Sequence, residues 1–248
     1  ENSFLKTIAW LANRSIDDLK KIVINQLSNP EKLIKTCNGN VINMFSADNT
    51  KKKNFDKNYK SWLTMNKTNE TSYTKKIYNS YLNIVSFLND TSLQHDHTIL
   101  WPILCYPGVI WNSGLNLYLF QIQNQSLVKY ICPYNGESYY YHYGEGFENT
   151  KTAFVTFRSF NNMFIYEPCI QISTNELGKI IPKSETKLFD SNLVWNYVAP
   201  LRIHCGITHK NKYITYLREN NYIKNPDNFF SIEKVLNIIK YDIYAQIL

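Results

Sequence analysis

Between residues 103 and 172, short runs of aromatic and aliphatic residues alternate with polar turn residues. Residues 127–134 and 137–143 are two such β-prone runs, and only Asn135 and Gly136 separate them. Both turn residues tolerate the positive φ that a two-residue type I′ turn requires. The pattern therefore predicts a tight β-hairpin with Asn135-Gly136 at its tip.

A two-residue turn also fixes the register of this predicted hairpin, because it decides which residues face each other. Val128 then faces Tyr143, and Lys129 faces His142. One face of the hairpin is expected to pack against a core. The opposite face holds Tyr140 beside Lys129 and His142, and we expect it to form a contact surface. The core-facing side holds four tyrosines, Tyr130, Tyr134, Tyr139 and Tyr141.

The same alternation predicts two more hairpins. Three hairpins in series form an antiparallel meander, and strands that are apolar on both faces need a second layer. The sequence therefore predicts an antiparallel β-sandwich or barrel. The additional strand pairs are residues 103–111 with 115–123 around a loop that ends in Gly114, and residues 153–160 with 163–172 around Asn161-Asn162. Asparagine is enriched among the non-glycine residues that adopt positive φ, as such a turn requires.

Helical spacing marks the N-terminal region. Ser15 is a good helix N-cap, and Asp17 and Asp18 follow it in the first turn, where carboxylates favour the helix dipole. Apolar residues then recur every three or four positions until Asn29-Pro30 ends the helix. The pattern predicts a well-capped helix between these signals.

The remaining segments carry weaker signals. Helices are expected after Ser3, over residues 71–88 and after Ser231; exposed loops over residues 46–60 and 173–192; and strands at residues 193–198, 201–208 and 212–217. These elements define an α+β protein in which N-terminal helices and a C-terminal helix pack on the β core. Residues 1–90 form a mainly helical region and residues 91–248 the β-rich part, unless the whole chain is a single domain.

The amino-acid composition indicates an AT-rich genome and says little about the chemistry of the protein. Asparagine, lysine, isoleucine and tyrosine are abundant, as in proteins from AT-rich genomes, including those of some viruses. The net charge is +7, which permits contact with nucleic acid or nucleotides. Only four arginines are present, however, and lysine-rich codon usage gives the same excess. A solvated basic surface is the favoured interpretation, with Lys51-Lys52-Lys53 in an exposed loop.

The cysteine count favours an intracellular, reducing compartment, such as the interior of a virus-infected cell. The five cysteines are an odd number, and none forms a CxxC pair. Reduced, unpaired thiols are therefore expected. No apolar run is long enough to span a bilayer, so no membrane span is predicted.

Metal binding is the first chemistry to consider. His95-Asp96-His97 would place two imidazoles on one side of an extended segment, and His204, Cys205 and His209 could add zinc ligands. The spacing matches no zinc signature, and ordinary surface or half-buried histidines are favoured. No metal and no cofactor are therefore predicted.

The densest polar-aromatic cluster is the run Tyr139–Tyr143 with Glu145. His142 could act as a general base, with Tyr140, Lys129 and Glu145 as further catalytic candidates. A tyrosine-rich hairpin more often packs a core on one face and a partner on the other. We therefore expect a structural or assembly protein, of viral type, that self-associates through Tyr140, His142 and Lys129. The alternative is a metal-independent nuclease or phosphodiesterase that acts on nucleic acid or nucleotides.

Overall fold

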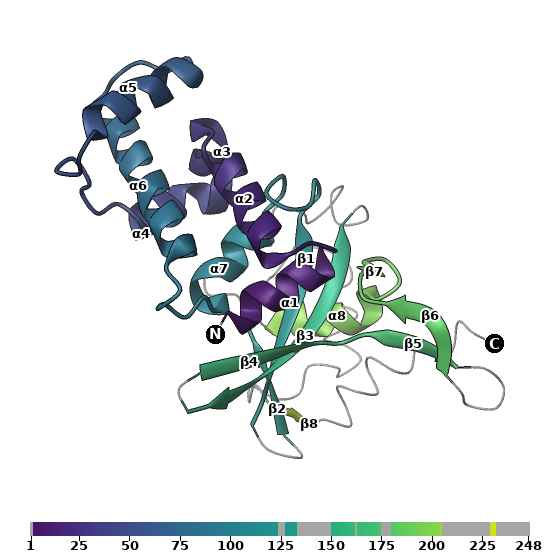
Figure 1. Ribbon diagram of the computed structural model, residues 1–248. Helices are drawn as coiled ribbons and strands as arrows, with labels where there is room; N and C mark the ends of the chain where they lie inside the picture. The colour runs from purple at the N-terminus through teal and green to yellow at the C-terminus, as the bar shows by residue number, and fades with distance from the viewer. Residues whose placement is uncertain are drawn as a thin grey trace. The chain divides into compact units, whose positions relative to one another are not determined.

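Helices make up the first part of the chain and strands most of the second (Figure 1). A computed structural model describes residues 2–123, 127–132, 150–161, 163–174, 180–204 and 229–231. The chain divides into two compact units, residues 1–112 and 113–248. The predicted α+β class is confirmed, because helices and a sheet of mixed strand orientation are both present.

The first unit is built from helices whose ends carry strong local signals. Ser15 Oγ accepts a hydrogen bond from the Asp18 backbone N–H at 3.1 Å, as its N-cap position predicts. Thr71 and Thr74 form a reciprocal capping box at the start of the longest helix. The elements are α1 Ser3–Leu11, α2 Ile16–Leu27, α3 Pro30–Lys35, η1 Thr36–Gly39, α4 Asn40–Met44, α5 Phe55–Met65, α6 Ser72–Asn89 and α7 His97–Leu104.

The core of the first unit includes an aromatic cluster between α5 and α6. Phe55 and Tyr59 of α5 lie with their ring centroids 5.5 Å and 5.4 Å from that of Tyr78 on α6. The Trp62 indole N–H donates to the Ser28 carbonyl at 2.9 Å and so ties α5 to the end of α2. The prediction of an exposed loop over residues 46–60 is therefore wrong from Phe55 onward. Lysines between the aromatic residues obscured their helical spacing.

The second unit contains a five-strand path, in the order β4-β3-β1-β2-β8, to which β7 adds beside β3. β1 pairs with β3 in parallel and with β2 in antiparallel orientation. A separate antiparallel pair joins β5 and β6. The strands are β1 Leu115–Ile122, β2 Leu127–Ile131, β3 Lys151–Phe160, β4 Met163–Pro168, β5 Gln171–Thr174, β6 Ile180–Thr186, β7 Phe189–Asp190 and β8 Phe229–Ser231, with one helix, α8 Trp195–His204.

One predicted hairpin is confirmed in part: β3 pairs with β4, whereas residues 171 and 172, predicted as the end of the second strand, belong to β5. Phe160 pairs with Met163, so the turn between the strands has two residues. Asn161 occupies the first turn position with φ of 48°, the left-handed conformation for which asparagine is suited. The Asn161-Asn162 pair was therefore sufficient to predict this turn.

The predicted meander is wrong. Asp96 caps α7 by accepting a hydrogen bond from Thr98 N–H at 2.9 Å, and α7 runs to Leu104. The first predicted strand, residues 103–111, therefore does not form. β1 instead lies between β2 and β3, so the order is not a simple series of hairpins. Neither a sandwich nor a closed barrel is shown.

The register predicted for the tyrosine-rich hairpin is also wrong where it is described. Lys129 pairs with Gln121 of β1 on one side and with Phe229 of β8 on the other. Both edges of β2 are therefore occupied at Val128 and Lys129, by residues other than the predicted partners. The turn Asn135-Gly136 and the strand after it lie outside the described residues.

Two later assignments are corrected as well. Part of the predicted loop at residues 173–192 forms the strands β6 and β7. Residues 195–204, which were predicted as parts of two strands, form α8 instead. Val198 and Leu201 of α8, and Val194 just before it, are buried in the core. Residues 205–208 of the second predicted strand lie outside the described residues. Pro200 lies inside this helix, although proline commonly breaks one. Ser231 ends β8, while the helix predicted after it and the strand at 212–217 lie outside the described residues.

Candidate functional site

Only one residue of the predicted tyrosine-rich site, Lys129, lies in the described part of the chain. Lys129 lies in β2, between its two strand partners, and is half-buried. Tyr140, His142 and Glu145 lie outside the described residues. The contact surface and the catalytic group proposed for this cluster are therefore untested.

His95 and His97 were predicted to lie on one side of an extended segment, but they do not. His95 is buried, and its ring nitrogens lie 2.6 Å from the Asn2 side-chain oxygen and 2.6 Å from the Phe87 carbonyl oxygen. His97 begins α7, and burial lowers its pKa. His95 therefore acts as a buried tie between the start of α1 and the end of α6.

Potential metal ligands were sought throughout the described part of the chain. No group of three or more histidine, cysteine or acidic side chains there could hold a metal ion. His204 is the last residue of α8, and Cys205 and His209 lie outside the described residues.

The cysteines differ from the prediction. Cys132, directly after β2, forms a disulfide bond, whereas Cys37, Cys105 and Cys169 are thiols. The expectation that every cysteine is reduced is therefore wrong at Cys132. An odd total had favoured unpaired thiols, but it is equally compatible with one disulfide and three thiols. The cysteines therefore do not indicate a reducing compartment.

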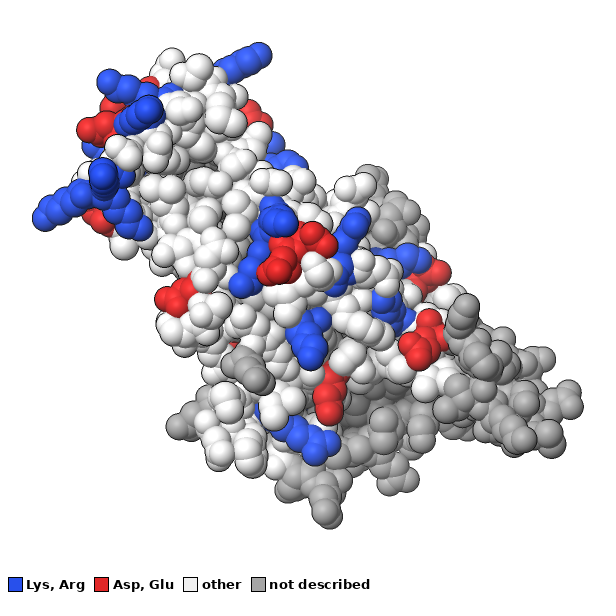
Figure 2. Space-filling view, viewed as in Figure 1, with Lys and Arg blue, Asp and Glu red and all other residues white. Residues whose placement is uncertain are grey.

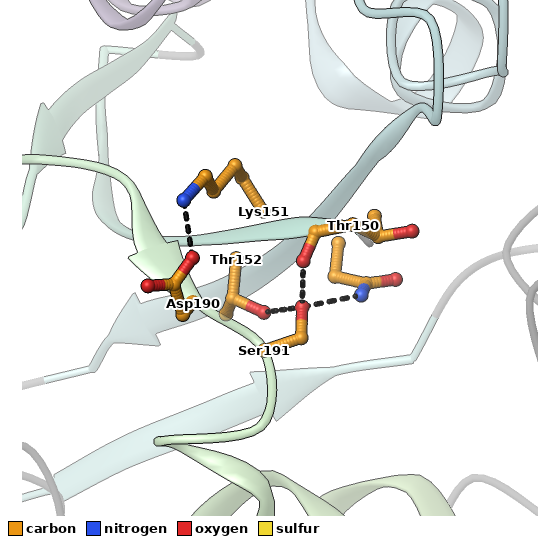
Figure 3. Close-up of polar contacts among 6 residues, drawn as sticks. Thr150, Lys151, Thr152, Asp190 and Ser191 are labelled. Carbon is orange, nitrogen blue, oxygen red and sulfur yellow. Dashed lines mark hydrogen bonds and ion pairs between the residues drawn. The ribbon is translucent and has the colours of Figure 1, made fainter. Parts of the chain in front are cut away.

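A buried polar network around Ser191 is the densest set of side-chain hydrogen bonds described in the second unit (Figure 3). The Ser191 hydroxyl donates to the Thr150 carbonyl oxygen. It accepts from the Thr152 hydroxyl at 2.8 Å and from the Asn116 amide at 3.1 Å. These residues are all nearly inaccessible to solvent. The network fastens the turn after β7 to β3 and β1.

The bonding pattern decides what this network can do chemically. The single Ser191 proton is donated to a backbone carbonyl and not to a base, so the hydroxyl is not activated as a nucleophile. The neighbouring ion pair of Lys151 with Asp190 lies on the exposed side of the same strands. The arrangement is suited to structural support rather than catalysis.

The β3–β4 hairpin has an exposed apolar surface, here named the hairpin patch. Phe160 is 61% exposed, Met163 45% and Ile165 47%. Phe160 pairs with Met163, and Ile165 with Arg158, so these side chains share one face. Glu167 follows on the same face and is exposed, as is Arg158. The hairpin patch thus combines an apolar centre with one positive and one negative side chain.

Sequence reasoning placed the contact surface on another hairpin, although the signal for this one was present. In β4, Met163 and Ile165 alternate with Phe164 and Tyr166, so apolar side chains occur on both faces. Tyr166 is buried, and the opposite face remains exposed. A strand that is apolar on both faces predicts a second layer, but within the described part of the chain this face of β4 stays exposed at Met163 and Ile165.

Comparison with known proteins gives no further information. No protein family, curated protein or solved structure matches the chain. None of the helices in the described ranges has the length and apolar character needed to cross a membrane.

Proposed function

We propose that this protein is a structural or assembly protein that self-associates, and that the hairpin patch is a contact between copies. The observation that carries the proposal is the exposure of Phe160, Met163 and Ile165 on one face of a β-hairpin. Contiguous apolar side chains on a soluble surface mark interaction sites more often than scattered ones do. Burying them removes apolar area from water, which is the main driving force for association.

The charges beside the hairpin patch support a second copy as the partner. Arg158 and Glu167 lie on the same face as Ile165 and are exposed. Two copies related by a two-fold axis along the strands would place Phe160 of each on Met163 of the other. Arg158 of each copy then lies diagonally across from Glu167 of the other. Such self-complementarity is what an isologous interface requires.

The tyrosine-rich surface remains a second proposed contact. Tyr140 and His142 are its proposed members, because tyrosine gives a large contact area at low entropic cost. Lys129 was grouped with them by a register that does not hold, since it pairs with Gln121 and Phe229. The alternative function, a nuclease or phosphodiesterase with His142, Tyr140, Lys129 and Glu145, draws no support from the described residues. Assembly is therefore the proposed function.

Sedimentation velocity over a range of protein concentrations tests the hairpin patch. Ile165→Lys places a charge in the centre of the patch, and we expect it to weaken self-association by about tenfold or more, because a buried charge without a partner is costly. Met65→Lys is the matched control, since Met65 is 80% exposed and belongs to the first unit. We expect this control to associate as the wild type does.

Three results separate the proposed contacts. A wild-type chain that stays monomeric at high concentration would contradict assembly altogether. Association that survives Ile165→Lys but is lost in Tyr140→Asp would assign the contact to the tyrosine-rich surface. Loss of a phosphodiesterase activity in His142→Ala, with association unchanged, would favour the enzyme alternative.

A further inference from the structure

The positive charge of the first unit is concentrated in one segment. Residues 48–76 contain eight lysines and three acidic residues, Asp48, Asp56 and Glu70. The rest of this unit, residues 1–47 and 77–112, contains six basic and six acidic residues and is therefore neutral. Lysine-rich codon usage predicts an even spread of lysine, so it does not explain this concentration.

The lysines lie on the outside of α5 and the loop before it. The lysines at positions 51, 52, 53, 57 and 60 are all exposed, and we name this set the basic patch. Figure 2 shows lysine side chains projecting at the α5 end of the first unit, with a few acidic side chains between them. Lys57 and Lys60 are three residues apart on α5, so they project from neighbouring positions on the helix surface.

The apolar side of α5 is already used inside the unit. Phe55, Tyr59, Trp62 and Leu63 are at most 8% exposed. Helices that bind in the plane of a membrane insert an apolar face between the lipids. α5 has no such face available, because these side chains form the core with α6. Apart from Met65 at its end, its exposed side carries charged and polar residues.

We propose that the basic patch binds the sugar–phosphate backbone of a nucleic acid. Phosphates along a strand form a closely spaced row of negative charges, which a short array of lysines can neutralise while counterions are released. Lysine acts as a point charge and does not read bases bidentately as arginine does. The binding is therefore independent of base sequence and weakens steeply as salt is added.

The basic patch is separate from the surface proposed for self-association. It belongs to residues 1–112, whereas the hairpin patch belongs to residues 113–248. The inference therefore does not depend on the assembly proposal, and either one can fail alone.

Fluorescence anisotropy with the full chain and a labelled oligonucleotide tests the inference at several salt concentrations. The probes are single-stranded DNA, duplex DNA and single-stranded RNA of mixed sequence. Replacing Lys52, Lys53, Lys57 and Lys60 by Gln removes four charges of the patch. We expect affinity to fall by at least about tenfold, and the magnitude of the slope of log K against log salt to fall by roughly 3.6 on duplex DNA.

A second fourfold variant controls for net charge. It replaces Lys6, Lys21, Lys32 and Lys35 by Gln, which removes the same charge from exposed positions elsewhere in the first unit. We expect it to bind as the wild type does, and thermal melting checks that both variants fold. Equal losses in the two variants would overturn the proposal, because binding would then follow total charge. Tighter binding to phosphatidylserine vesicles than to every nucleic acid would also overturn it.

Discussion

At the residue scale, asparagine does more than reflect codon usage. The Asn49 backbone N–H donates to Asn79 Oδ1 at 3.2 Å, and the Asn49 amide donates to Asn83 Oδ1 at 2.8 Å. Asn83 in turn donates to the Phe45 carbonyl at 2.8 Å, so three asparagines fasten the segment after α4 to α6. Asn54 and Asn161 also adopt positive φ at turns. Composition alone could not assign these roles, because they depend on contacts between distant segments.

Ser191 provides a residue-scale prediction about stability. Ser191→Ala removes the acceptor of the Thr152 hydroxyl and the Asn116 amide, and with it the hydroxyl that donates to the Thr150 carbonyl. Buried polar groups that lose a partner cost about 1–3 kcal/mol each. We expect the free energy of unfolding to fall by about 3 kcal/mol in urea titrations.

Ser159→Ala is the matched control for this prediction, because Ser159 is exposed on the same strand, β3. Its unfolding free energy should stay within about 0.5 kcal/mol of the wild type. A Ser191→Ala protein as stable as the control would show that the network contributes nothing to stability.

At the element scale, the sequence was informative where the signals were local. The caps at Ser15 and Thr71 and the turn at Asn161 lie within a few residues of the structure they specify. α8 was missed because Pro200 lies inside it, and α5 because lysines interrupt its aromatic spacing.

Strand pairing was the least predictable feature, because it depends on segments far apart in the chain. β1 and β3 pair in parallel, with Leu115 beside Lys151, and no turn specifies that register. The hairpin patch was missed for a similar reason. Which face of the strand stays exposed depends on which segments cover the other face, and no local sequence pattern indicates those segments.

The turn at Asn161 gives a prediction about the stability of the β3–β4 hairpin. The Asn161 φ of 48° is in the left-handed region, which a β-branched residue adopts only with strain. We expect Asn161→Val to lower the free energy of unfolding by about 1–2 kcal/mol, and Asn161→Gly to leave it nearly unchanged. Urea unfolding of the three proteins measures both effects. If the valine variant were as stable as the glycine variant, the left-handed turn would be contradicted.

At the scale of the whole molecule, the two proposed surfaces respond to salt in opposite ways. The basic patch in the first unit depends on phosphate contacts, which salt weakens. The hairpin patch in the second unit depends on apolar burial, which salts such as sulfate strengthen. Raising the salt concentration therefore separates nucleic-acid binding from self-association in the same wild-type protein.

The cysteines give the last prediction, which concerns the whole chain. With Cys132 in a disulfide and three cysteines as thiols, denatured and unreduced protein should release three reactive thiols from its five cysteines. Burial raises the pKa of Cys169 to about 11 from 9.0, so little thiolate forms near neutral pH. In the folded protein, its alkylation at pH 8 should therefore be roughly a hundredfold slower than that of an unperturbed cysteine, and should rise as the pH approaches 11. Mass spectrometry of alkylated peptides measures both the count and the rate. Five reactive thiols in the denatured chain would show that Cys132 is reduced, and four would indicate a disulfide between two copies. Rapid alkylation of Cys169 at pH 8 in the folded protein would contradict its burial.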